Sequence, residues 1–111
     1  GELGGRQWTG PRRALLRSLA ESLILYEKIR TTKAKAKAAQ ALAEKLITKA
    51  RGQTLSARRE LAKILYTQNA VKKLMEVLGP RYKEKRGGYT RIINLNSRKG
   101  DAAEDAIVEF V

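Results

Sequence analysis

The pair Gly79-Pro80 separates two parts of the chain whose apolar residues follow different periods. Before the pair, apolar residues recur at the i, i+3, i+4 and i+7 spacing of a helix, at Val71, Leu74, Met75 and Leu78. Beyond residue 88, the segments 89–95 and 106–111 read as strands, and the polar residues 96–101 (NSRKGD) between them form a turn. Helical segments followed by a hairpin restrict the chain to a fold that mixes helices with a small sheet.

The first third of the sequence carries a helix signal followed by a strand signal. Pro11 suits the first turn of a helix over residues 12–26. The apolar stripe of that helix is expected at Leu15, Leu16, Leu19, Leu23 and Tyr26. Residues 27–32 (EKIRTT) are rich in β-branched side chains and read as a short strand.

A threonine precedes the next helix. Thr31 or Thr32 caps a helix that runs to about Arg51 and stops at Gly52. Its buried stripe is expected at Ala34, Ala38, Ala41, Leu42 and Leu46.

Two shorter helices complete the helical part. Thr54 caps one, with Leu61, Ile64 and Leu65 facing inward, and the other starts at Gln68 or Asn69 and ends at Gly79-Pro80. The order α-β-α-α-α-β-β predicts an α+β fold, with helices packed on one face of a two- to three-stranded sheet. We expect a single small domain over residues 11–111, preceded by a flexible or extended segment at residues 1–10.

Residues 79–92, GPRYKEKRGGYTRI, combine three kinds of residue that suit nucleic acid. Against one acid, Glu84, they hold five cations: Arg81, Lys83, Lys85, Arg86 and Arg91. Cations bind phosphates, the rings of Tyr82 and Tyr89 could stack on bases, and Gly87 and Gly88 could let backbone approach a ligand closely. The plainer interpretation is a solvated basic loop with two ordinary tyrosines. Because all three kinds occur together, we favour contact with nucleic acid, with Tyr82 facing RNA and Tyr89 in the core.

Other cations lie one helical turn apart on the expected helices. Arg13 and Arg17 form one such pair and Lys33 and Lys37 another. Either pair could simply face solvent, but we favour phosphate contact for both. The remaining candidate contacts are Arg6, Arg12, Lys28, Arg30, Arg98 and Lys99.

Several collinear segments resemble ribosomal protein seventeen of the bacterial large subunit. They are GPRYKEKRGGYTRI, PRRALLRSLAESLILYEKIRTT from Pro11, AEKLITKAR from Ala43, AVKKLMEVLGPRYK from Ala70 and GDAAEDAIVEFV at the C-terminal end. The opening GELGGRQWTG departs from the family's usual start. The resemblance implies the same α+β layout and a structural constituent of the large subunit that binds large-subunit rRNA. It also implies neighbouring ribosomal proteins as partners near the polypeptide exit tunnel, in a cytoplasmic ribosome or a bacterial-type ribosome of an organelle.

Composition excludes several other functions. The chain has no Cys and no His, so disulfides, zinc clusters, thiol nucleophiles and the commonest general base are ruled out. Asp101, Glu104 and Asp105 lie in a polar turn and read as solvated rather than catalytic, so we expect no enzyme, no cofactor and no bound metal. No apolar run approaches the ~20 residues of a spanning helix, and no signal peptide is visible, so we expect no membrane partner.

Charge is distributed unevenly along the chain. With 24 basic and 11 acidic residues the net charge is +13, a self-repulsion that a phosphate partner would relieve. The C-terminal residues 101–111 are instead acidic. Because carboxylates repel phosphates, we expect these acids to face solvent or a basic neighbouring protein rather than RNA: Asp101, Glu104, Asp105 and Glu109. The alternative to an rRNA-binding protein is a DNA-binding or nucleoid protein, since short helices and high charge also suit a helix-turn-helix. A nuclease is a third and weaker alternative, because metal-ligand and His chemistry are missing.

Overall fold

The computed structural model describes residues 11–95 and 105–111. In chain order the elements are α1 (Pro11–Tyr26), β1 (Lys28–Thr32), α2 (Lys33–Ala50), α3 (Leu55–Ile64), α4 (Gln68–Lys73), the π-helical segment η2 (Leu74–Leu78), α5 (Gly79–Arg81), β2 (Thr90–Asn94) and β3 (Asp105–Phe110). The predicted α+β class and order of elements are confirmed. The predicted N-terminal segment 1–10 and the turn at 96–101 lie outside the described residues.

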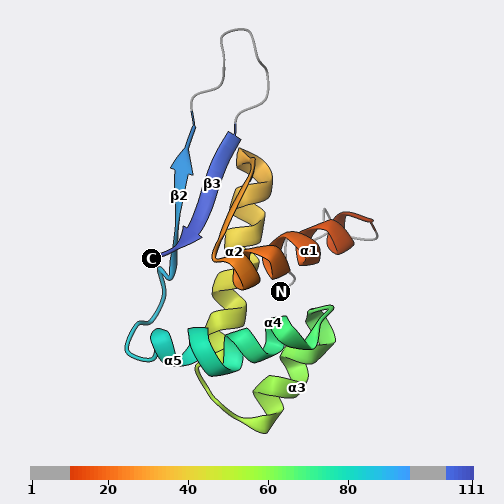
Figure 1. Ribbon diagram of the computed structural model, residues 1–111, viewed down its shortest axis with the longest axis vertical. Helices are drawn as coiled ribbons and strands as arrows, with labels where there is room; N and C mark the ends of the chain where they lie inside the picture. The colour runs from red at the N-terminus through yellow and green to blue at the C-terminus, as the bar shows by residue number, and fades with distance from the viewer. Residues whose placement is uncertain (1–10, 96–104) are drawn as a thin grey trace, which may run out of the picture.

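Three antiparallel strands form one sheet in the order β1-β3-β2. The predicted hairpin of β2 and β3 is present, and β1 pairs with the other edge of β3. The last strand is therefore central, and its Ala106 and Val108 are fully buried. The helix α2 runs along one face of the sheet, with α1 crossing beside it and α3 to α5 gathered at its far end (Figure 1).

Small residues let α2 lie close to its neighbours. Ala36, Ala39 and Ala43 are fully buried, in positions where larger side chains would hold the backbones apart. The predicted burial of Leu42 and Leu46 is confirmed, but Ala34 and Ala41 are exposed, so that part of the stripe is wrong. Alanines are so frequent in α2 that several faces fit a helical spacing, and only tertiary packing chooses among them.

The predicted stripe of α1 is also displaced. Leu16 and Leu23 are buried as expected, whereas Leu15 and Tyr26 are 40% and 75% exposed. The buried face of α1 includes Ala20 instead, which belongs to the core that α1 shares with α2, α3 and α4.

The helical backbone does not end at Gly79-Pro80 as predicted but continues to Arg81. Gly79 N–H reaches back five residues to Leu74 O, in the wide turn of a π-helical segment. Pro80 has no N–H to donate, and Gln53 Nε2 donates to Met75 O at 2.8 Å instead. The Met75 carbonyl, which Pro80 cannot bond, therefore accepts a hydrogen bond from another part of the chain, and the helix tolerates the proline.

We expect Gly79→Ala to destabilise the fold by about 1–3 kcal/mol, although alanine is the better helix former. A Cβ at Gly79 would lie 2.9 Å from Gln53 Nε2 and 3.0 Å from Ala50 O. Urea unfolding measures the change. Gly52→Ala is the matched control because its Cβ would stand 3.4 Å from Lys49 O, and it should be nearly neutral. A Gly79→Ala protein as stable as wild type would contradict this packing.

Candidate nucleic-acid interface

The basic loop, defined as residues 82–89, joins α5 to β2 and presents three exposed cations, Lys83, Lys85 and Arg86. Gly87 and Gly88 have φ angles of +143° and +66°, which L side chains rarely adopt. A Cβ at Gly87 would meet nothing within 4 Å, so backbone conformation rather than lack of space requires glycine there. Close approach of a ligand at these glycines stays a prediction.

The two tyrosines of the basic loop are both buried. Tyr89 is fully buried, which confirms its predicted core position. Tyr82 is only 5% exposed, its hydroxyl donates to Val111 O, and its ring centroid lies 5.2 Å from that of Tyr89. The prediction that Tyr82 stacks on a base is therefore wrong. The turn after α5 directs the ring between Tyr89 and Phe110, where it packs as an aromatic core residue.

The basic loop is fastened to the end of α2 by Arg51, a residue that no sequence pattern selected. Arg51 Nη2 donates to Lys83 O at 3.0 Å, and Nη1 donates to the Tyr89 hydroxyl at 3.2 Å. That hydroxyl in turn donates to Lys85 O at 3.2 Å. These bonds fix the loop backbone, while the side chains of Lys83 and Lys85 remain exposed. No local pattern indicates them, because Arg51 and its partners are more than thirty residues apart in the sequence.

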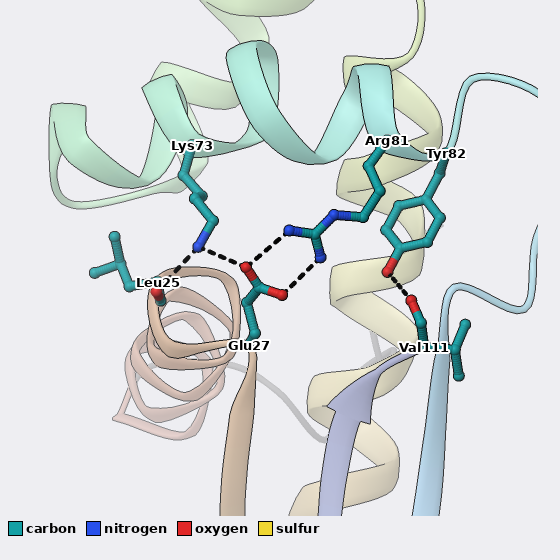
Figure 2. A network of polar contacts seen from close by, with 6 residues as sticks. All are labelled: Leu25, Glu27, Lys73, Arg81, Tyr82 and Val111. Atoms are coloured by element: carbon teal, nitrogen blue, oxygen red, sulfur yellow. Dashed lines mark hydrogen bonds and ion pairs between the residues drawn. The ribbon is translucent and has the colours of Figure 1, made fainter.

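Arg81, just before the loop, has an internal carboxylate partner. Its Nη1 and Nη2 donate to Glu27 Oε1 and Oε2 at 2.6 and 3.0 Å, and Lys73 Nζ lies 3.0 Å from Glu27 Oε2 (Figure 2). Lys73 also donates to Leu25 O at 3.2 Å. The Glu27 side chain thus ties the turn between α1 and β1 to α4 and α5. Because Arg81 already faces a carboxylate, it offers phosphate less charge than the sequence predicted.

The Glu27 network makes stability depend on pH. The hydrogen bonds from Arg81, and to a lesser degree those from Lys73, lower the pKa of Glu27 from 4.5 to about 2, while partial burial opposes this shift. The folded-state pKa is below the unfolded one, so the stabilisation is present above pH 4.5 and is lost as the pH falls from 4.5 towards 2. Urea midpoints across this range should fall more for wild type than for Glu27→Gln. Glu60→Gln, which changes an exposed pair with Lys49, is the control and should follow wild type. Parallel curves for wild type and Glu27→Gln would contradict the network.

On the open face of the sheet, acidic and basic side chains of neighbouring strands form ion pairs with one another. Glu109 lies between Lys28 and Arg91 in the register, with its Oε2 2.7 Å from Arg91 Nη2, and Asp105 Oδ2 is 3.2 Å from Arg30 Nη2. Asp105 and Glu109 therefore pair with cations of this chain, which the sequence did not indicate, and their facing solvent or a neighbouring protein rather than RNA stays a prediction. The other two acids of that prediction, at positions 101 and 104, lie outside the described residues.

The remaining predicted contacts lie on α1 and at the start of α2. Arg12, Arg13 and Lys37 are exposed, and Arg17 and Lys33 are half-buried. The start of α1 and the loop after α5 lie on opposite sides of the molecule (Figure 1). The fold therefore does not gather the predicted cations into one patch. The candidates Arg6, Arg98 and Lys99 fall outside the residues that the structure describes.

Neither a membrane span nor a metal cluster is found in the part of the chain that the structure describes. No helix within residues 11–95 and 105–111 is long and apolar enough to cross a membrane. The same residues contain no group of three or more acidic side chains placed to hold a metal ion.

Comparison with known proteins places these features in a family. The profile of the family described as Ribosomal protein L17 matches residues 15–111. The chain is 51% identical to the large ribosomal subunit protein bL17 of Endomicrobium trichonymphae over 100 residues, which cover 90% of this chain and 86% of the relative. It is 50% identical to bL17 of Solibacter usitatus, covering 93% and 69% of the two chains, and 46% identical to bL17 of Desulforamulus reducens, covering 93% and 92%.

Proposed function

Because the chain belongs to the Ribosomal protein L17 family, and so is a constituent of the large ribosomal subunit rather than an enzyme, we propose that it binds large-subunit rRNA with its basic loop as the principal site. The contacts would be salt links from Lys83, Lys85 and Arg86 to rRNA phosphates. Base stacking has no part in this proposal, since the rings of Tyr82 and Tyr89 are buried.

The observation that carries the proposal is the contrast between the loop cations and the other cations near them. Arg81 and Arg91 each face a carboxylate of this chain, whereas Lys83, Lys85 and Arg86 form no ion pair within the described part of the chain. Their charges are held together at the surface by a backbone that is fixed before any ligand arrives. Preorganised cations bind phosphate at a smaller cost in conformational entropy.

The distribution of the remaining cations supports a structural role in RNA packing. Two pairs of cations lie outside the loop, Arg13 with Arg17 on α1 and Lys33 with Lys37 on α2. The start of α1 lies on the side of the molecule opposite the loop (Figure 1). Cations on separate sides can neutralise phosphates of separate RNA segments and lower the repulsion between them. A helix-turn-helix protein instead presents one face to one DNA groove, so the arrangement favours RNA over the DNA-binding alternative.

The partners within this proposal are rRNA and neighbouring ribosomal proteins. The seat near the polypeptide exit tunnel comes from the family resemblance alone. The chain would lie in the compartment of its ribosome, which is either the cytoplasm or an organelle.

The proposal predicts how a tagged copy of the protein sediments. It should be found with large ribosomal subunits and remain bound at moderate salt, because several phosphate contacts must break together. Sucrose gradients at two salt concentrations measure this distribution. Recovery mainly as free protein, or with chromosomal DNA, would contradict the proposal.

A further inference from the structure

A groove of about 540 Å³ lies between α2 and the basic loop, and the sequence analysis selected residues of its loop wall but none of its α2 wall. Lys45, Thr48 and Lys49 line it from α2, and Arg86 and Gly87 line it from the loop. We propose that this groove holds one strand of RNA through its phosphodiester backbone. The inference rests on the proposed function and extends it from the loop to the outer face of α2.

The charges that line the groove suit a polyanion. Three cations face it against one carboxylate, Glu44, which is directed towards the sheet because its Oε2 accepts from Thr90 N at 3.0 Å and Thr90 Oγ1 at 2.7 Å. Lys49 pairs with Glu60, but both side chains are at least 40% exposed. Exposed pairs of this kind contribute little to stability, so a phosphate can replace the carboxylate at small cost.

The width of the groove is set by the fold. Thr48 Oγ1 lies 3.3 Å from the Tyr89 hydroxyl, on the same side chain that donates to Lys85 O. Arg51, one residue beyond α2, holds Lys83 O. The wall formed by the loop is therefore tied to the wall formed by α2, and the backbone segments that carry the cations keep their spacing without a ligand.

The groove suits the backbone of RNA rather than its bases. Among its lining residues the donors are the charged ends of Lys45, Lys49 and Arg86, and none of the lining residues is aromatic. Phosphate contacts of this kind fix position without reading sequence. Gly87 has no side chain, so the loop wall stays low where a sugar-phosphate chain would pass.

Tethered cleavage tests the inference because the chain has no Cys of its own. Single cysteines are introduced on each side of the groove, Ala41→Cys one turn before Lys45 on α2 and Glu84→Cys in the loop, both at exposed positions that keep the lining residues intact. Each is loaded with an iron chelate that generates hydroxyl radicals, and the protein is assembled into large subunits. Ala62→Cys, exposed on α3 and outside the groove lining, is the control.

If one strand lies in the groove, the probes at positions 41 and 84 will cleave the same short stretch of rRNA, and the probe at 62 will not cleave that stretch. Cleavage from 84 alone, or from 41 at an unrelated stretch, would overturn the inference and leave the proposed function intact. If an acidic protein segment rather than RNA filled the groove, rRNA would be cleaved from position 84 alone. Absence of rRNA cleavage from both 41 and 84 would count against the proposed function as well.

A charge reversal in the groove gives a second readout. Lys45→Glu should lower the slope of log affinity against log salt by about one, and Lys72→Glu, an exposed change of equal charge on α4, should lower it less. Equal slopes for the two variants would contradict the groove.

Discussion

Replacing Tyr89 by alanine should destabilise the fold by about 3–5 kcal/mol, a large part of the roughly 5–15 kcal/mol that holds a typical domain together. The ring is fully buried against Tyr82, and the hydroxyl bonds to Arg51 and Lys85. Alanine leaves a cavity and removes the hydrogen bonds that fasten the basic loop. Chemical denaturation followed by circular dichroism measures the change.

Tyr26 supplies a matched control for this prediction, since it is the same residue type at 75% exposure. Tyr26→Ala should change stability by less than about 0.5 kcal/mol. Tyr89→Phe keeps the ring and removes the hydroxyl, so it should cost about 1 kcal/mol. Equal stability of Tyr89→Ala and Tyr26→Ala would show that Tyr89 is not a core residue.

Replacing Lys83, Lys85 and Arg86 together by alanine should weaken binding to large-subunit rRNA roughly a hundredfold, at about 1 kcal/mol for each charged side chain removed. The slope of log affinity against log salt should fall by about one for each phosphate that is no longer neutralised. These side chains are exposed, so folding stability should change little. Filter binding over a salt titration, with thermal unfolding in parallel, separates the two effects.

The control for the triple loop variant removes the same charge elsewhere. Arg58, Arg59 and Lys63 are exposed on α3, and their replacement by alanine changes the net charge equally. Binding should fall much less, because only diffuse attraction between unlike charges is weakened. Equal reductions in affinity for the two triple variants would mean that net charge, rather than the loop, determines binding.

Local features of the fold could be predicted from the sequence. Thr32 and Thr54 cap their helices as expected, accepting from Lys35 N at 3.3 Å and Ala57 N at 2.9 Å. A cap involves residues three apart, so the sequence pattern contains the whole interaction. The strand at β1 and the final hairpin follow from equally local signals.

Features that depend on distant residues could not be predicted in this way. The position of Tyr82 depends on Val111, and the loop depends on Arg51, and no spacing rule connects these residues. Glu27 and Gln53 adopt the left-handed backbone conformation, with φ angles of 66° and 55°, although neither is glycine. Each is held there by long-range bonds, Glu27 to Arg81 and Gln53 to the Met75 carbonyl, which stabilise a backbone that the local sequence disfavours.

In the candidate site, the lysines of α2 that the sequence analysis did not select follow a spacing that could have identified them. Lys45 and Lys49 repeat the four-residue spacing of Lys33 and Lys37, and this repeat could have extended the candidate set along the helix. The fold was needed to show that the later pair lies opposite the basic loop. Sequence alone would not have separated Arg81 from Arg86, since the ion pair with Glu27 distinguishes them.

A density map of the assembled large subunit, at a resolution that shows side chains, would reveal what the basic loop contacts. We expect Lys83, Lys85 and Arg86 to contact rRNA phosphates while Tyr82 and Tyr89 remain in the protein core, with no base stacked on either ring. A map in which the basic loop faces solvent or another protein, and rRNA binds elsewhere on the chain, would contradict this expectation.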